Sequence, residues 1–424
     1  MAIIVQKFGG TSLADSDKIK NVAKAVVREK KLGNDVIVVV SAMGHTTDNL
    51  IKLAHEISDH PSEREMDMLM STGEQISISL LAIAIHELGY KAVSMTGAQV
   101  GIYTEETHSK ARIIDIKTDK LTEHLKNDEI VIVAGFQGIT KSGEITTLGR
   151  GGSDTSAVAI AAKLRVENLG IERCDIYSDV EGIYTTDPRV VPTAKKLDVI
   201  SYEEMLELAR VGANVLHPRS VETAKQFQVP MRLRSSFKLD DLGTLIIGVE
   251  KMEIYKPVTG LACDKSQVRV VICDIPDRPG NAGKLFSLLA KYELSVDMII
   301  QSYARSSNNT NDIAFTIDKD DLSKFVTLKD EIVAIMNPSN IHIDEDIAKI
   351  SIVGAGMIDR PGIAAMMFET LAKEGINIKM ISTSEIKISC LVEKMYAKQA
   401  TEALCKCFEL DGSDVALVHG TLPD

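Results

Sequence analysis

Residues 3–12 read IIVQKFGGTS, an aliphatic run that leads directly into a Gly-Gly turn. Continuous aliphatic runs suit strands that are buried on both faces of a sheet. A second run, DVIVVV at residues 35–40, follows a stretch in which Ile19, Val22 and Val26 recur at helical spacing. The alternation continues with a helical pattern at residues 80–88 and aliphatic runs at residues 92–95, 130–136 and 174–180. We therefore expect an α/β sandwich with a mainly parallel sheet.

The composition limits the class of protein. The chain has 424 residues, enough for two or three domains that each bury a core. A formal net charge of −12 argues against a nucleic-acid partner, because phosphate backbones are bound by basic surfaces. No charged leader precedes an apolar segment and no run of about 18 apolar residues occurs, so we expect a cytoplasmic protein without a membrane partner. Six cysteines without paired C-x-x-C spacing predict no metal site.

The last third of the chain contains an internal repeat. The segment DRPG at residues 277–280 recurs at residues 359–362, and LAK at residues 289–291 recurs at residues 371–373. Each copy shows the order strand, Pro-Gly turn, helix, strand, strand, helix and a further apolar run, which is typical of a β-α-β-β-α-β module. The turn exposes backbone N–H groups at a helix N-terminus, so each copy could bind a small carboxylate or could be a packing module without a ligand.

Two glycine clusters are candidates for phosphate binding. The first is Gly9-Gly10, preceded by Lys7, whose ammonium would add a positive charge. The second is LGRGGSDTS at residues 148–156, which precedes an apolar helix. Ser153 and Asp154 could cap this helix, but a cap does not explain Arg150, whose guanidinium suits a bidentate contact with a carboxylate or phosphate. No Walker A pattern occurs, and a Gly-Gly turn alone could be an ordinary tight turn.

A third polar segment, YSDVEGIYTTDPR at residues 177–189, follows a buried strand. Nucleotides usually bind at the carboxyl ends of the strands in open α/β sheets. The segment is therefore a candidate nucleotide-binding loop.

These segments together resemble the amino acid kinase family, and within it the aspartate kinases. The motifs occur in the family's order over essentially the whole chain: KFGGTS, VVVSAMG, STGE, TLGRGGSD, residues 179–189 and ISTSEIKIS. The resemblance implies a three-layer α/β/α kinase domain with a mainly parallel sheet at residues 1–246, followed by two ferredoxin-like ACT domains. The first would comprise residues 265–338, and the second residues 247–264 together with 339–424. The implied reaction is ATP-dependent phosphorylation of L-aspartate, the first step of lysine, threonine and methionine biosynthesis.

The resemblance also implies roles for individual residues. Lys7 would balance charge on the transferring phosphoryl group, and Asp154 would assist it near the phosphates. Glu74 would hold the α-ammonium group of aspartate, and Arg150 its α-carboxylate. The remaining nucleotide contacts would be Gly9, Gly10, Ser178, Asp179, Tyr184 and Arg189; the remaining substrate contacts would be Ser41, Thr47 and Ser153, with Ser41 and Gly44 also beside the phosphates.

The chemistry explains why no catalytic histidine is needed. A side-chain carboxylate has a pKa near 3.9, so it is already an ionised nucleophile at neutral pH. Catalysis then requires alignment of two anions and neutralisation of charge by lysine, backbone N–H groups and Mg²⁺. The Mg²⁺ ion would be held largely by ATP oxygens and water. His217, in the segment VLHP, is therefore interpreted as structural.

Two positions depart from the family pattern. Asn214 stands where the family usually has a lysine on the nucleotide side, which puts phosphate affinity in question. His45 stands where an acid is expected.

The two ACT domains imply an oligomer that binds effectors. By the resemblance they would pair across a homodimer or a dimer of dimers and bind lysine, threonine or both, although Met252 could also start a separate small subunit. The effector contacts would be Asp277, Asn281, Asp297 and Gln301 in the first domain and Ser382 and Glu385 in the second.

Two other functions stay open from the residues alone. Another amino acid kinase would act on glutamate, acetylglutamate or a nucleotide, but Glu74 with Arg150 favours a free α-amino acid. A non-catalytic regulatory subunit or amino-acid sensor would have lost the kinase motifs, whereas Lys7 and Asp154 are present.

Overall fold

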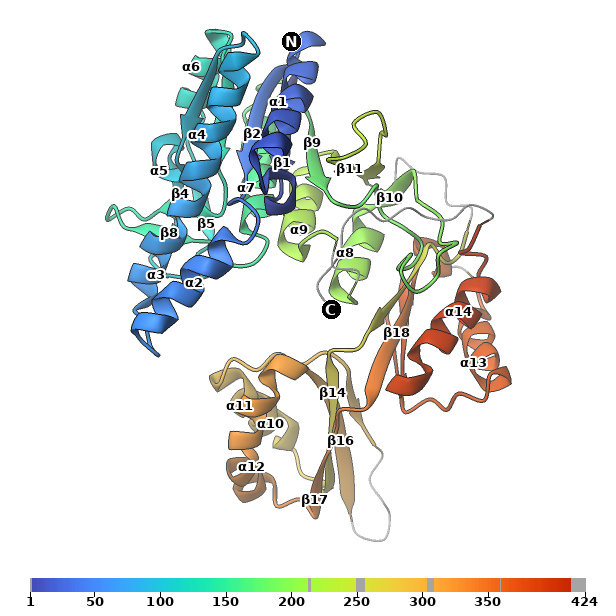
Figure 1. Ribbon diagram of the computed structural model, residues 1–424. Coiled ribbons are helices and arrows are strands. Elements are labelled where there is room, and N and C mark those ends of the chain that lie inside the picture. The colour runs from blue at the N-terminus through green and yellow to red at the C-terminus, as the bar shows by residue number, and fades with distance from the viewer. Residues whose placement is uncertain (1, 213–214, 249–255, 303–308, 359, 413–424) are drawn as a thin grey trace.

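The computed structural model describes residues 2–212, 215–248, 256–302, 309–358 and 360–412 (Figure 1). An eight-stranded sheet forms its centre, in the order β10-β12-β11-β9-β1-β2-β6-β3. Its strands are β1 (Ile3–Phe8), β2 (Asp35–Val40), β3 (Ala92–Met95), β6 (Ile130–Ala134), β9 (Ile171–Ser178), β10 (Val199–Ser201), β11 (Met231–Ser235) and β12 (Thr244–Ile247). Neighbouring strands are parallel except β11 and β12, so the predicted mainly parallel sheet is confirmed.

Helices cover both faces of this sheet, as the aliphatic runs predicted. Val36, Val38 and Val40 face α1 (Ser16–Lys31) and α4 (Thr72–Glu87). Ile37 and Val39 point to the opposite face, where the helices are α6 (Asp119–Lys126), α7 (Gly152–Val166), α8 (Tyr202–Arg210) and α9 (Pro218–Phe227). Because alternate residues of a strand point to opposite faces, one aliphatic run supplies two cores and fixes the three-layer sandwich.

A small mixed sheet lies beside the central sheet and had no clear signal in the sequence. Its order is β5-β4-β7-β8, with β4 (Ile102–Thr104), β5 (Ile113–Ile116), β7 (Gln137–Ile139) and β8 (Ile145–Thr147). Next to it are α2 (Thr46–Ile57), α3 (Glu63–Met70) and α5 (Gly97–Val100). Residues 63–87, which form α3 and α4, are long and apolar enough to cross a membrane, but half of the relevant window is buried inside the fold. A core helix meets the same criterion, so this is weak evidence for a membrane span.

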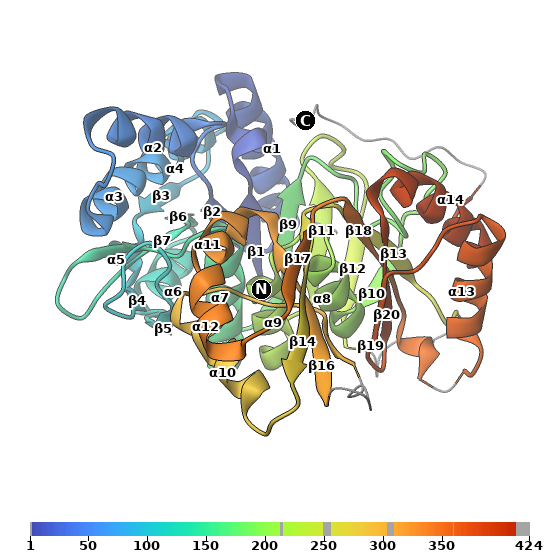
Figure 2. The same ribbon diagram turned by 90° about the horizontal axis from the view of Figure 1, so that it is seen from below.

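The last third forms two four-stranded antiparallel sheets with helices on one face. The first, β15-β16-β14-β17, comprises β14 (Gln267–Pro276), β15 (Ile299–Gln301), β16 (Thr310–Asp318) and β17 (Asn340–Asp344), with α10 (Asn281–Lys291), α11 (Leu322–Thr327) and α12 (Lys329–Met336). The second, β13-β18-β20-β19, comprises β13 (Gly260–Asp264), β18 (Ile347–Val353), β19 (Met380–Thr383) and β20 (Lys387–Glu393), with α13 (Ile363–Lys373) and α14 (Ala397–Cys407). The two predicted ferredoxin-like modules are confirmed; Figure 2 shows them from below.

The two modules differ in the origin of one edge strand. In the first, β17 follows the module's own helices and pairs with β14. In the second, the equivalent position beside β18 is taken by β13, which precedes the first module in the chain. We propose that the first module is an insertion between β13 and β18, and that its boundary lies after Asp344 rather than after residue 338, because β17 belongs to its sheet.

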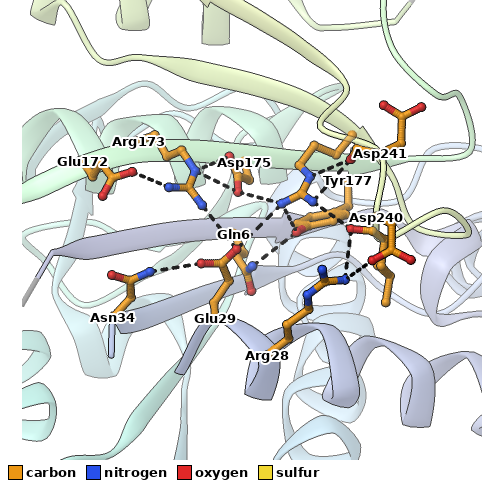
Figure 3. Close-up of polar contacts among 12 residues, drawn as sticks. Gln6, Arg28, Glu29, Asn34, Glu172, Arg173, Asp175, Tyr177, Asp240 and Asp241 are labelled. Carbon is orange, nitrogen blue, oxygen red and sulfur yellow. Dashed lines mark hydrogen bonds and ion pairs between the residues drawn. The ribbon is translucent and has the colours of Figure 1, made fainter. Parts of the chain in front are cut away.

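A buried charged cluster joins α1 to β9 and β11 on the face of the sheet that α1 covers (Figure 3). Arg173 Nη2 lies 3.2 Å from Glu29 Oε1, and its Nε donates to both oxygens of Asp175. Arg234 donates to the Tyr177 hydroxyl at 3.0 Å, and the Tyr177 ring stacks on Phe8 with centroids 4.4 Å apart. Burial raises the pKa of Asp175 while the two arginines oppose that shift. The cluster therefore fixes β1 and β9 relative to each other next to their carboxyl ends.

Candidate active site

The carboxyl ends of β1 and β2 bring two tight turns together. Gly10 starts a short 3₁₀ turn after β1, and its carbonyl accepts the Gly44 N–H at 3.0 Å. A Cβ at Gly10 would lie 2.8 Å from the Ala42 carbonyl oxygen, closer than real contacts allow. This close approach requires glycine and leaves backbone groups of both turns facing one cavity.

Lys7 and Asp154 meet between β1 and the start of α7. Lys7 Nζ lies 2.6 Å from Asp154 Oδ1. A Cβ at Gly9 would lie 3.5 Å from Lys7 Nζ, so the ammonium group lies beside the first glycine turn. The expectation that Ser153 or Asp154 caps α7 is wrong: the cap is Gly151, in the left-handed region at φ +68. The helix begins earlier because glycine tolerates that φ, and Asp154 therefore lies in its first turn.

The His217 ring packs against the second glycine turn at Gly151. A Cβ at Gly151 would lie 2.3 Å from the His217 ring, so the ring fills the space that a side chain would need. Burial, helped by the nearby Arg219 charge, lowers the pKa of His217 and keeps the ring neutral at pH 7. These observations support the structural interpretation of this histidine.

Glu74 lies in the first turn of α4 and is only 2% exposed. Its Oε1 accepts the Ala42 N–H at 3.1 Å, whereas Oε2 has no hydrogen-bond partner among the described residues. Burial raises the pKa of Glu74 to about 7. A buried carboxylate with a free oxygen is unfavourable unless a cation joins it, so the site suits an ammonium group.

These groups line one cavity of about 590 Å³, which we call the glycine-loop cavity. It brings together nine of the predicted positions: Lys7, Gly10, Ser41, Gly44, Thr47, Glu74, Arg150, Ser153 and Asp154. Asp48, Met70, Ser109, Lys110 and Phe136 also line it, and no motif in the sequence pointed to them. Three cations and three carboxylates thus surround one space of a size that suits a small substrate.

The predicted nucleotide loop lines a separate cavity of about 260 Å³, which we call the Tyr184 cavity. Ser178, Asp179, Tyr184 and Arg189 lie on its wall, together with apolar residues that include Leu208, Val215 and Leu261. A Cβ at Gly9 would lie 3.9 Å from the Tyr177 carbonyl oxygen, so Gly9 borders the strand that leads into this loop. Arg189 is held by Asp187, with Nε donating at 2.9 Å.

The predicted effector residues are dispersed over the two modules. Asp277 accepts from Asn311 at 3.1 Å, Asn281 donates to the Pro276 carbonyl at 2.7 Å, and Gln301 ends β15. Asp297 Oδ2 lies 2.6 Å from the ammonium of Lys349, a buried residue of the second module. Glu385 lines a cavity of about 490 Å³ around the repeated Pro-Gly turn, whereas Ser382 lies on β19 outside that lining.

Some predicted features cannot be placed. Asn214, Met252 and Asp359 lie outside the described residues. Within the part of the chain that is described, no group of three or more His, Cys, Asp or Glu side chains could hold a metal ion.

Comparison with known families and proteins agrees with this geometry. Residues 2–235 match the amino acid kinase family, and residues 350–408 match an ACT domain. An aspartokinase of Bacillus sp. (strain MGA3) is 51% identical over 415 residues, covering 98% of this chain and 99% of that protein. The aspartokinase of Corynebacterium glutamicum is 47% identical over 422 residues, covering 99% of both chains.

A solved structure is similar over the same length. The crystal structure of Escherichia coli aspartokinase III in complex with aspartate and ADP (R-state) gives a TM-score of 0.80 at 28% identity, covering 96% of this chain and 100% of that chain. The fold is thus shared over 96% of this chain with an aspartokinase of known structure. The chain belongs to the amino acid kinase family, as an aspartokinase with C-terminal ACT domains.

Proposed function

We propose that ATP and L-aspartate meet in the glycine-loop cavity, where the γ-phosphoryl group passes to the side-chain carboxylate of aspartate. The observation that carries this proposal is the buried Glu74 carboxylate, which has a free oxygen in the same cavity as Lys7 and Arg150. An amino acid needs one acid and one base for its two α-substituents. Glu74 would bind the ammonium group and Arg150 the α-carboxylate.

The reaction then follows from orientation and charge. With both α-substituents held, the β-carboxylate, which is ionised at neutral pH, is left to attack the γ-phosphorus. One carboxylate oxygen forms the new P–O bond, and the bond from the γ-phosphorus to the ADP oxygen breaks. Lys7, held by Asp154 at 2.6 Å, would stabilise the charge that spreads over the phosphoryl oxygens, with Ser41, Thr47 and Ser153 completing the substrate contacts.

The nucleotide would extend from the glycine turns into the Tyr184 cavity. Gly9, Gly10 and Gly44 would face the phosphates, and the apolar wall with Tyr184 would suit the adenine ring. Ser178, Asp179 and Arg189 would contact the sugar and phosphate groups. Mg²⁺ would arrive with ATP and neutralise phosphate charge, while Asp154 supplies the protein carboxylate next to the phosphates.

Effector binding is proposed for the ACT modules. The crystal structure of E. coli aspartokinase III in complex with lysine and aspartate (T-state) is similar to this chain, with a TM-score of 0.74 at 28% identity. We propose that lysine, threonine or both bind at the modules of a homodimer or dimer of dimers, with Asp277, Asn281, Asp297, Gln301, Ser382 and Glu385 as candidate contacts. A cytoplasmic location is proposed with this function.

The experiment measures ATP- and aspartate-dependent acyl phosphate, trapped as hydroxamate, in the purified protein with Mg²⁺. Hydroxamate formation that falls when lysine or threonine is added would support both the reaction and its regulation. No hydroxamate, together with heat released on mixing with lysine or threonine, would instead identify an amino-acid sensor. Hydroxamate formed from glutamate but not from aspartate would identify a different amino acid kinase.

A further inference from the structure

The loop between β4 and β5 places two residues without an assigned role, Ser109 and Lys110, on the wall of the glycine-loop cavity. Ser109 has φ +66, in the left-handed region that few residues other than glycine adopt. Its N–H donates to both oxygens of Asp67, at 3.1 and 3.0 Å. The conformation that carries Lys110 into the cavity is therefore held from α3.

Asp67 is fully buried and is the centre of this clamp. Besides Ser109, it accepts a hydrogen bond from Thr147 Oγ1 at 2.6 Å and contacts His108 Nδ1 at 2.9 Å. Thr147 ends β8, immediately before the segment that carries Arg150. One buried carboxylate thus binds both loops that border the cavity at this side, and a buried charge with several donors is strongly oriented.

Arg219 joins the same two loops from α9. Its Nη1 donates to the Leu148 carbonyl at 2.9 Å and its Nη2 to the Ala111 carbonyl at 3.4 Å. A Cβ at Gly149 would lie 3.4 Å from Lys110 Cγ, so the stem of Lys110 packs against Gly149, the residue before Arg150, and both cations line the cavity. Lys110 and Arg150 are therefore neighbours at the wall of one cavity.

Of the three cations that line the glycine-loop cavity, Lys110 and Arg150 are available to bind a ligand. Lys7 is paired with Asp154 at 2.6 Å. No ion pair of Lys110 or Arg150 is present within the described residues. Two adjacent cations without acidic partners suit an anionic group with two oxygens, and a carboxylate between them would satisfy both.

We propose that Lys110 is a substrate-binding residue that, with Arg150, holds the α-carboxylate of aspartate, and that Asp67 positions it. This inference rests on the proposed function, because it uses aspartate as the substrate and Glu74 as the partner of its ammonium group. It adds a specificity determinant: recognition of the α-carboxylate depends on two cations, one from each clamped loop.

The test compares Lys110→Met, Lys110→Arg and Lys120→Met in the full chain, using aspartate and its α-amide, L-aspartic acid 1-amide. Lys120 is an exposed lysine of α6 outside the cavity and serves as the matched control. In K110M the KM for aspartate should rise about tenfold, as expected for loss of one hydrogen bond to a charged group, with the KM for ATP unchanged. The preference for aspartate over the amide should fall by the same factor. K110R keeps the charge and should recover part of both effects, while K120M stays near wild type.

Asp67 is tested by a double-mutant cycle. Asp67→Asn should raise the KM for aspartate, and the effect of D67N/K110M should be clearly smaller than the sum of the two single effects, because part of the action of the clamp passes through Lys110. Thr147→Val loosens the same clamp more mildly and replaces D67N if that variant does not fold, as judged by thermal melting. Additive effects would show that Asp67 does not position Lys110.

The inference is overturned if K110M keeps the wild-type KM for aspartate, or if only its KM for ATP rises. The proposed function fails separately, in the wild-type protein, if aspartate gives no acyl phosphate at all.

Discussion

At the scale of single residues, burial of the Glu74 carboxylate in the glycine-loop cavity lowers the free energy of unfolding. Its carboxylate is buried with one oxygen unpaired, and burial raises its pKa to about 7. The ordinary pKa of this group is 4.5. The folded protein thus keeps a group that is costly when ionised, as expected where the missing partner is a substrate cation.

Replacing Glu74 should separate stability from activity. Because its pKa is raised on folding from the ordinary 4.5, the folded state binds the proton more tightly, and stability falls as pH rises from about 4.5 through about 7. Glu74→Gln removes that dependence, so its melting temperature should exceed that of wild type at pH 8 and approach it at pH 5. Calorimetric scans at both pH values measure this, and equal melting temperatures at pH 8 would contradict the assigned ionisation.

The same residue predicts the pH dependence of catalysis. Protonated Glu74 cannot pair with an ammonium group, so kcat/KM for aspartate in the wild-type enzyme should rise with pH and level off above about pH 7. The E74Q variant should have a strongly raised KM for aspartate without this step. A pH profile that keeps the same step in E74Q would assign the titration to another group.

Lys7 is expected to act on the transition state more than on binding. Lys7→Met should lower kcat by about 10²- to 10³-fold, the usual effect of removing a group that stabilises developing charge, with a smaller change in KM for ATP. Lys7→Arg keeps the charge and should restore part of kcat. Steady-state kinetics with ATP and aspartate varied separately measure this; a change confined to KM would reduce Lys7 to a binding role.

The sequence identified the residues that lie in compact motifs and missed those that meet only through the fold. Lys7 and Arg150 were predicted from glycine-rich local patterns and Glu74 from the family resemblance, and all three line one cavity. Asp67 and Lys110 carry no pattern of their own. Their proximity depends on the pairing of strands of three or four residues, which are too short to give a reliable periodic signal.

At the scale of elements, β13 connects the sheet of the second module to the loop at residues 179–189. Leu261 pairs with Ile352 of β18 on one side, and its N–H donates to the Thr185 carbonyl at 2.7 Å on the other. Residues 261–263 also line the Tyr184 cavity. Thr185 Oγ1 donates in turn to the Leu410 carbonyl. A displacement of the second module would therefore move the loop at residues 179–189 through these hydrogen bonds.

Weakening the contact between Thr185 and the second module should reduce the binding of ATP more than the binding of aspartate. Thr185→Val keeps the shape of the side chain but removes its hydrogen bonds to Leu410 and to the Lys195 N–H. The KM for ATP should rise about fivefold, as expected for the loss of about 1 kcal/mol, with the KM for aspartate within twofold of wild type. Initial-rate kinetics distinguish the two, and an equal rise in both constants would contradict a local effect.

At the scale of the whole molecule, the sheet of the second module combines β13, which precedes the first module in the chain, with strands that follow it. The sequence repeat predicted two modules, whereas the assignment of residues 247–264 to the second module was implied only by the family resemblance, because strand pairing across a long insertion leaves no local pattern. β13 and β18 lie side by side, and buried Glu204 of α8 accepts hydrogen bonds from Thr259 Oγ1 at 2.6 Å and the Ala355 N–H at 3.0 Å. The second module therefore completes the kinase fold.

Two deletions test this arrangement. A chain that ends at Ile247 loses β13 and one wall of the Tyr184 cavity, so it should bind ATP weakly and melt at a lower temperature. The matched control replaces residues 267–346 with Asn-Gly, which joins β13 to β18 as a hairpin and removes only the first module. Calorimetric titration with ATP should show near-wild-type binding for the control. Equal ATP affinity in the chain ending at Ile247 and the full chain would refute the structural role of the second module.

The most direct test of the central claim is a crystal structure of the protein with L-aspartate and ADP bound. We expect the α-ammonium group within hydrogen-bond distance of Glu74, the α-carboxylate at Arg150 and the β-carboxylate facing Lys7 in the glycine-loop cavity. Aspartate bound elsewhere, or turned so that its β-carboxylate contacts Arg150 and points away from Lys7, would contradict it.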